Sequence, residues 1–293
     1  MARKVVLAIM LVLSAASFAR AQEKAKLLIG LVPEENIFRM IEKHLPLADY
    51  IEKRTGIKIQ FTILSRYGDI IDRFTTRNMD GAFFGAFTGL LANRKLGVQP
   101  LVRPVGPDGL VSAQSIVFVR KDSGIRTFAQ MRGKRAVFVD KATATGFIYL
   151  LYRLKQIGVT DYSRFFRQYY FTGNHEESIY AVLDGRADVG VVKSRFFDKL
   201  SLRDPLISER LLVLAKSNKL PDIILCLRSD IPAAIRNELK RTLINMKNDP
   251  EGARVLRTLG YSGFEEAKPA DFAPAAELTR EAGINIMTYQ YTR

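Results

Sequence analysis

The stretch GNHEESIYAVLDGRADVGVV (173–192) decides the fold, because its plan occurs twice in the chain. A turn leads into a short amphipathic helix, and Asp188 then opens a strand of small residues. The stretch RYGDIIDRFTTRNMDGAFFG (66–85) repeats this order, with Asp80 at the equivalent place. Chance similarity of two strand–helix–strand units is the alternative. Because such units build parallel sheets, we expect two similar lobes of α/β type.

Strands and helices alternate on both sides of these two copies, and the spacing of apolar residues distinguishes them. Gly56 and Gly158 each follow a helical pattern, as is common where helices end. The expected strands cover residues 26–32, 57–64, 82–85, 135–139, 168–171 and 189–192, and the expected helices cover 34–54 with a break near Pro46, 69–77, 146–157 and 176–184.

Two more strands cross between the expected lobes. SAQSIVFVRKDSGI (112–125) is apolar in its middle and is typical of a strand that leaves the first lobe. The chain returns near KLPDIILCLRSDIP (219–232), before a helix that starts at Pro232. Two crossings make a hinge, and a hinge between two lobes makes a cleft that closes. We expect lobe 1 to comprise residues 22–114 and 220–293, and lobe 2 to comprise residues 115–219.

The first 21 residues have the pattern of a cleavable secretory signal peptide. Arg3 and Lys4 precede an apolar run over residues 5–13, and Ala-Arg-Ala (19–21) fits the cleavage site. The apolar run is shorter than the roughly 20 residues that a membrane-spanning helix needs. We therefore expect a mature, exported chain that starts at residue 22.

Composition excludes several classes of partner and chemistry. The formal net charge is +15, but the Lys and Arg residues are scattered and form no run typical of a nucleic-acid-binding arm. The single cysteine, Cys226, lies in the apolar stretch IILCL (223–227), where we expect a buried free thiol and no internal disulfide. We expect no nucleic-acid partner.

Catalytic motifs are missing from the sequence. Two histidines, His44 and His175, are too few for a metal site built from His ligands. The chain contains no Gly-x-Ser-x-Gly turn, no Walker-type phosphate loop and no cysteine in a nucleophile context. We expect a binding protein without catalysis, cofactor or metal.

Candidate ligand residues follow the expected strands. In open parallel sheets, ligands bind outside the carboxyl ends of the strands, where helices begin. Tyr67 and His175 follow equivalent strands of the two repeats, so they are candidates to face one another across the cleft. Thr88 and Gly89 follow the strand 82–85 of the first lobe. Tyr67 as an aromatic at the edge of the core, and His175 as an ordinary first-turn helix residue, are the structural alternatives.

The stretch DKATATGFIYLL (140–151) lies where a strand of the second lobe ends and a helix begins. The first N–H groups of a helix have no partner inside it, and the helix dipole makes that end partly positive. This end is a possible anion cradle, with Thr143 and Thr145 as extra donors and Gly146 in the turn. Ordinary helix capping would also explain the two threonines.

These stretches resemble the periplasmic phosphate/phosphite/phosphonate-binding proteins of ABC transporters. The resemblance runs from LIGLVPEEN (28–36) to about residue 265, and its more specific parts are RKDSGIRTFAQMRGKRAVFVDKATATG (120–146) and TGNHEESIYAVLDGRADVGVV (172–192). It implies the two-lobed type II solute-binding fold, or Venus flytrap, with two parallel or mixed sheets joined by two hinge strands. It also implies a periplasmic location.

The resemblance implies a role for five of the candidate residues. Thr143, Thr145 and Gly146 stand where the family's Ser-x-Ser-Gly turn holds the phosphonate oxygens, and Tyr67 and His175 match its ligand-facing Tyr and His.

Three positions depart from the family pattern or lie at variable places. Ala144 replaces the middle hydroxyl residue of the turn, and Gly89 is expected to enlarge or reline the pocket. Lys193 lies where some relatives place a polar or acidic group that contacts the organic part of the ligand. A cation there would suit a second negative charge, whereas a solvated surface lysine is the alternative.

The sequence therefore predicts a solute-binding protein that captures a phosphorus oxyanion (phosphonate, phosphite or phosphate) for an ABC importer. The expected partners are a small anionic ligand and an ABC permease, and we expect a monomer. Two alternatives stay open: a clam-shell sensor that signals to a membrane receptor, and a binder of another small organic ligand such as a vitamin precursor.

Overall fold

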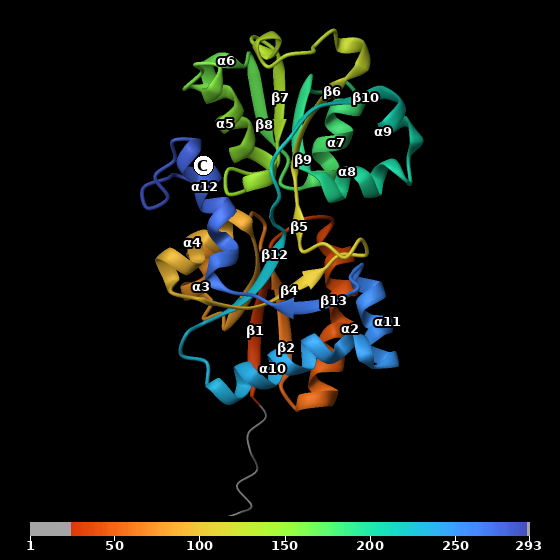
Figure 1. Ribbon diagram of the computed structural model, residues 1–293, viewed down its shortest axis with the longest axis vertical. Helices are drawn as coiled ribbons and strands as arrows, with labels where there is room; N and C mark the ends of the chain where they lie inside the picture. Colours follow the sequence, from red (N-terminus) through yellow and green to blue (C-terminus); the bar gives the residue numbers. More distant parts are fainter. Residues whose placement is uncertain (1–24, 292–293) are drawn as a thin grey trace, which may run out of the picture.

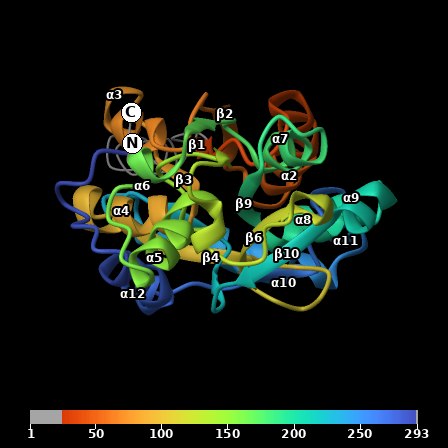
Figure 2. The ribbon, with the colours of Figure 1, turned by 90° about the horizontal axis from the view of Figure 1, so that it is seen from above.

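The computed structural model describes residues 25–291, which form two α/β lobes (Figure 1). The expected signal peptide, residues 1–21, lies outside the described residues. Within 25–291, no helix combines the length and the apolar character that crossing a membrane requires. Each lobe is built around one mixed sheet with helices on both faces (Figures 1 and 2).

Lobe 1 holds a six-stranded sheet in the order β13-β4-β12-β3-β1-β2. Lobe 2 holds a five-stranded sheet in the order β10-β6-β9-β7-β8. The strands are β1 (Lys26–Leu31), β2 (Lys58–Ile63), β3 (Gly81–Gly85), β4 (Gln99–Val105), β12 (Ile223–Leu227) and β13 (Gly263–Glu266) in lobe 1, and β6 (Ser115–Arg120), β7 (Arg135–Phe138), β8 (Gln168–Phe171), β9 (Val189–Lys193) and β10 (Leu211–Lys216) in lobe 2.

The two sheets share the arrangement of the repeated strands, as the sequence repeat predicts. β1 is parallel to both β2 and β3, and β7 is parallel to both β8 and β9. In each lobe the next strand, β12 or β6, follows a crossing and runs antiparallel. Asp80 accepts a hydrogen bond from the Leu28 N–H at 2.8 Å, and Asp188 accepts one from the Arg135 N–H at 2.8 Å. The repeated Asp therefore fixes the start of the neighbouring strand in both lobes.

The two crossings pair with each other between the lobes. β5 (Ser112–Ala113) runs antiparallel to β11 (Leu220–Pro221), forming a two-stranded hinge (Figure 1). We propose that the lobes divide at this pair, near residues 114 and 220.

The helices of lobe 1 are α2 (Ile37–Thr55), α3 (Asp69–Thr76), α4 (Ala86–Leu96), α10 (Ala233–Asn245), α11 (Pro250–Leu259) and α12 (Ala273–Glu281). Those of lobe 2 are α5 (Tyr149–Gln156), α6 (Tyr162–Phe165), α7 (His175–Leu183), α8 (Ser194–Ser201) and α9 (Pro205–Arg210). α12 packs against α4 of lobe 1 and also against α5 of lobe 2. The C-terminal helix therefore joins the lobes at one side of the cleft.

The expected break near Pro46 is wrong, because α2 continues through this proline. Proline removes the hydrogen bond to the carbonyl four residues earlier. That carbonyl belongs to Glu42, which is exposed, so water can satisfy it. Asn36 caps the helix start by accepting hydrogen bonds from the N–H groups of Phe38 and Arg39.

The expected buried thiol is confirmed. Cys226 is fully buried in β12 between β3 and β4 and carries no disulfide. Burial raises the pKa of its thiol, which keeps the group neutral and unreactive.

Candidate functional site

A small cavity between the lobes brings together five of the seven predicted ligand residues. Its volume is about 10 Å³, which is the room that one water molecule needs. A phosphorus oxyanion is larger, so its entry requires the lobes to open. The predicted residues on its wall are Tyr67, Thr143, Thr145, His175 and Lys193, and the other lining residues are Glu34, Gly85, Ala86, Phe87, Ala142, Ala144, Pro221 and Asp222.

His175 is held as a neutral donor that faces this cavity. It is the first residue of α7, where Asn174 caps the helix by accepting a hydrogen bond from the Glu177 N–H. The backbone N–H of Lys193 donates to His175 Nδ1 at 3.1 Å, so the ring proton belongs on Nε2. Burial, followed by the charge of Lys193, lowers the pKa of His175 well below its usual value. The ring stacks on Phe196 with centroids 4.9 Å apart.

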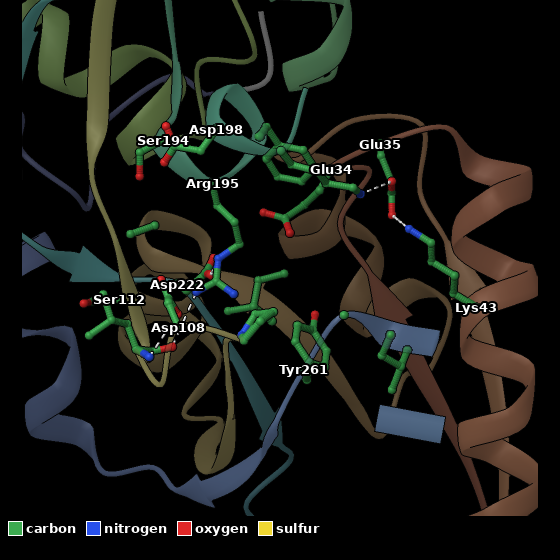
Figure 3. Close-up of a pocket in the computed structure, with 18 of the residues that line it drawn as sticks. Glu34, Glu35, Lys43, Asp108, Ser112, Ser194, Arg195, Asp198, Asp222 and Tyr261 are labelled. Atoms are coloured by element: carbon green, nitrogen blue, oxygen red, sulfur yellow. Dashed lines mark hydrogen bonds and ion pairs between the residues drawn. The ribbon is translucent and has the colours of Figure 1, made fainter. Parts of the chain in front are cut away.

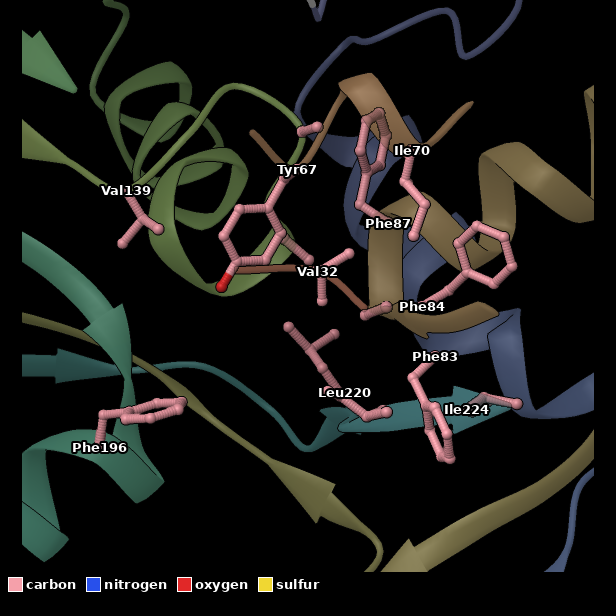
Figure 4. Packing of buried hydrophobic residues seen from close by; sticks show 14 of the residues in the cluster. Val32, Tyr67, Ile70, Phe83, Phe84, Phe87, Val139, Phe196, Leu220 and Ile224 are labelled. Carbon is pink, nitrogen blue, oxygen red and sulfur yellow. The ribbon is translucent and has the colours of Figure 1, made fainter. Parts of the chain in front are cut away.

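Tyr67 supplies a second donor from lobe 1. Its ring meets the His175 ring edge-on, with centroids 6.3 Å apart. The hydroxyl points away from the packed side chains of Ile70 and Phe87 (Figure 4). Burial, followed by the charge of Glu34, raises the pKa of Tyr67 well above its usual value, so the hydroxyl keeps its proton.

Both donors are buried and have no partner in the described part of the chain. Within residues 25–291, neither Tyr67 Oη nor His175 Nε2 has a hydrogen-bond acceptor, although the two residues are 3% and 1% exposed. A buried donor without an acceptor costs about 1–3 kcal/mol, so proteins rarely leave one unexplained. Two such donors at one cavity indicate a site for an acceptor-rich ligand.

The threonine turn of lobe 2 forms the third wall. Thr143 precedes one wide turn of π-helix, Ala144–Ile148, which leads into α5. Such turns are frequent at functional sites. The Thr143 hydroxyl donates to the Asp140 carbonyl at 2.6 Å, so its proton is committed within the turn. Thr145 also lines the cavity, next to the N–H groups at the start of the helix.

Asp140 stabilises this turn through a hydrogen bond. Its Oδ1 accepts a hydrogen bond from the Ala142 N–H at 2.8 Å. Burial raises the pKa of Asp140 to about 6, although the N–H of Ala142 acts against this rise. The carboxyl group therefore titrates close to neutral pH.

Thr88 and Gly146 do not line the cavity. The Thr88 hydroxyl turns back to the Gly85 carbonyl at 3.3 Å, inside a fully buried part of α4. Gly146 is needed for packing, because a Cβ there would lie 2.6 Å from the Val139 Cβ. Local hydrogen bonding thus explains the threonine at position 88, and close packing explains the glycine at position 146.

The expected enlargement of the pocket at Gly89 is also wrong. A Cβ at Gly89 would lie 2.5 Å from the Phe272 ring, so this glycine lets the ring pack closely on α4. The segment AFTGLLA (86–92) belongs to α4.

Lys193 is buried in an ion network, and the surface-lysine alternative is wrong. The residue is 4% exposed, and its Nζ contacts Glu34 Oε1 and lies 2.7 Å from Asp222 Oδ1. Arg195 Nε lies 3.0 Å from Asp222 Oδ2. Burial alone would lower the pKa of Lys193, but Asp222 and Glu34 outweigh it and raise the pKa.

The two carboxylates respond differently to this network. Burial raises the pKa of Glu34, although Lys193 opposes it. Burial acts in the same direction on Asp222, but Lys193 and Arg195 outweigh it and lower the pKa. Asp222, which faces two cations, is therefore the stronger anion of the pair.

Sequence reasoning missed Glu34 and Asp222 as site residues. Glu34 follows β1, at the carboxyl edge of the sheet where ligand residues were sought, so its position carried a usable signal. Asp222 lies between the hinge strand β11 and β12, and no local pattern marks it.

A larger cavity of about 690 Å³ lies beside the small one in the cleft. Glu34 and Asp222 line both cavities, so the ion network stands between them. Figure 3 shows Arg195 reaching toward Asp222, with Glu35 and Lys43 on the opposite wall. Among residues 25–291, no group of three His, Cys, Asp or Glu side chains gathers that would hold a metal ion.

Comparison with known proteins places the chain in a family. Residues 29–272 match the family model described as "ABC transporter, phosphonate, periplasmic substrate-binding protein". The chain is 24% identical over 268 residues to the "Phosphonates-binding periplasmic protein" of Escherichia coli (strain K12), covering 89% of this chain and 78% of that protein.

Two solved structures share the fold. One is a binding protein component of an ABC phosphonate transporter from Pseudomonas aeruginosa, with a TM-score of 0.80, 20% identity, and coverage of 89% of this chain and 87% of that one. The other is PhnD1 from Prochlorococcus marinus in complex with methylphosphonate, with a TM-score of 0.77, 17% identity, and coverage of 89% and 99%. The two-lobed type II fold expected from the sequence is confirmed.

Proposed function

Because the chain belongs to the family of periplasmic substrate-binding proteins of phosphonate ABC transporters, we propose that it captures a phosphorus oxyanion between its lobes for such a transporter. The ligand class comprises phosphonates, phosphite and phosphate. The partner is the membrane permease, which receives the ligand from the closed lobes. Cleavage after residue 21 and a monomeric state are part of this proposal.

One observation carries the proposal: two buried donors that have no acceptor within residues 25–291, Tyr67 Oη and His175 Nε2, face one cavity from different lobes. A tetrahedral oxyanion offers acceptors in several directions, so one ligand can satisfy both donors. Hydrogen bonds to a charged acceptor in a dry site are roughly twice as strong as neutral ones. Because both donors are needed, binding favours closure of the lobes over the ligand.

The threonine turn supports the same ligand class. Thr145 and the N–H groups at the start of the following helix lie on the same cavity wall. A helix N-terminus favours anions through its unsatisfied N–H groups and its dipole. The departure at Ala144 removes one hydroxyl donor and leaves these backbone donors in place.

Gly89 gives no support to the sensor alternative. An altered pocket at this position would favour a repurposed site, but Gly89 packs against Phe272. The members of the matched family are binding proteins of transporters, and we propose that this chain binds its ligand without turnover.

A thermal-shift panel followed by calorimetry tests the proposal. Residues 22–293 are titrated with phosphate, phosphite and methylphosphonate, with sulfate and a vitamin precursor as comparison ligands. Since a ligand stabilises the form that binds it, we expect a rise of several degrees with at least one phosphorus oxyanion and a stoichiometry of one. Stabilisation by none of the three phosphorus oxyanions would contradict the proposal.

A further inference from the structure

The charges of the ion network at the ligand cavity balance one another. Lys193, Glu34 and Asp222 line the cavity, and their side chains are 5%, 13% and 8% exposed. Arg195 adds a second cation, paired with Asp222. Two carboxylates and two cations therefore balance, and no carboxylate on this wall is left for a positively charged ligand.

The network spans both lobes. Lys193 ends β9 of lobe 2, whereas Glu34 follows β1 of lobe 1 and Asp222 lies beside the hinge. The contact between Lys193 and Glu34 therefore joins the two lobes across the cleft. Any selection that it exerts acts when the two lobes come together around the ligand.

A substituent attached to the bound phosphorus has to lie near this network, because the same small cavity holds both the donors and the ions. An ammonium group taken out of water requires a carboxylate partner. Here the carboxylates are already paired with the ammonium group of Lys193. A second cation would have to displace a buried lysine or remain beside it without a counter-ion.

We propose that the ammonium group of Lys193 is the counter-ion of Glu34 and Asp222 and occupies the position that a ligand cation would take. The protein therefore accepts phosphorus oxyanions with uncharged substituents and rejects aminoalkylphosphonates. This inference rests on the proposed function and specifies its substrate class. Lys193 acts here as a specificity residue, through its charge and its occupancy of the two carboxylates.

The test uses two ligands of nearly equal size that differ in charge. Propylphosphonate and 2-aminoethylphosphonate have the same chain length, and only the second carries an ammonium group. Isothermal titration of residues 22–293 should give an affinity for propylphosphonate at least about 30-fold higher than for 2-aminoethylphosphonate, as expected for an uncompensated buried charge. Equal affinities would overturn the inference.

Substitution of the lysine should reduce the preference for the uncharged ligand. In Lys193→Met a carboxylate becomes available, so the affinity for 2-aminoethylphosphonate should rise at least about tenfold while that for propylphosphonate does not rise. In the double variant Glu34→Gln/Lys193→Met the remaining charges, Asp222 and Arg195, balance again, and the gain should disappear. If the single variant folds poorly, the comparison of the two ligands on the wild type still tests the inference.

Lys199→Met is the matched control. Lys199 pairs with Glu35 at 3.4 Å and lines the larger cavity but not the small one, so the ratio of the two affinities should stay unchanged. Binding of methylphosphonate but of neither longer ligand, by wild type and Lys193→Met alike, would show selection by size and overturn the inference. Failure of every phosphorus oxyanion to bind would instead contradict the proposed function.

Discussion

Tyr67→Phe should weaken ligand binding without weakening the fold. The Tyr67 hydroxyl is buried and has no acceptor within residues 25–291, so its removal breaks no internal hydrogen bond. Relief of an unsatisfied donor stabilises a protein by about 1–3 kcal/mol. We therefore expect the ligand-free variant to be as stable as the wild type, or more stable by up to that amount.

The same substitution removes a donor to a charged ligand. A hydrogen bond to a charged group contributes about 1.5–3 kcal/mol, which corresponds to roughly a 10- to 150-fold loss of affinity. Isothermal titration with the tightest ligand of the panel measures the affinity, and urea unfolding without ligand measures the stability. The affinity should fall, whereas the stability should rise or stay unchanged.

Tyr149→Phe is the matched control for this prediction. Tyr149 is equally buried, but its hydroxyl donates to the Lys216 carbonyl at 2.8 Å and it lies outside the ligand cavity. This variant should lose about 1 kcal/mol of stability and keep its affinity. A Tyr67→Phe protein that loses stability like the control, or that binds its ligand as tightly as the wild type, would refute the reasoning.

Four further substitutions test the threonine turn and the residues that support it. Thr145→Val should reduce the affinity about tenfold, as measured by titration. Thr143→Val should mainly lower the stability, because the Thr143 hydroxyl already donates to the Asp140 carbonyl. The reverse pattern would be inconsistent with the geometry. Burial raises the pKa of Asp140 from 3.8 to about 6, so its contribution to stability falls as pH rises from about 4 to about 6. Asp140→Asn should thus match the wild type in unfolding at pH 4 and exceed it at pH 7 by up to about 3 kcal/mol, and equal stabilities at pH 7 would contradict this. Gly146→Ala should destabilise the protein by about 1–3 kcal/mol through contact with Val139, and an unchanged melting temperature would exclude that packing role.

The repeated unit could be predicted because its signals are local. Apolar spacing, a turn and an Asp recur in both copies, and the structure places β1-β3 and β7-β9 in the same arrangement. The expected strands do not include Gln99–Val105, where Pro100 and Pro104 argue against a strand inside a sheet. Tertiary pairing with β12 and β13 overrides this local preference.

The site residues also divide into those that the sequence predicts and those that it does not. The positions of Tyr67 and His175 follow from the repeat, since equivalent strand ends of two facing lobes meet at one cleft. The burial of Lys193 could not be predicted, because its partners Glu34 and Asp222 lie 159 and 29 positions away in sequence. Such an ion network exists only once two lobes and a hinge are assembled.

The two histidines of the chain allow the most direct test of the site, by nitrogen NMR of protein labelled at histidine. His175 lines the small cavity and His44 lines the larger one, so each reports on a different place in the cleft. Substitution of His44 assigns the signals. Saturation with a phosphorus oxyanion should shift the Nε2 signal of a neutral His175 and leave His44 almost unchanged. A shift confined to His44, or none at either histidine on saturation, would contradict a ligand site at Tyr67 and His175.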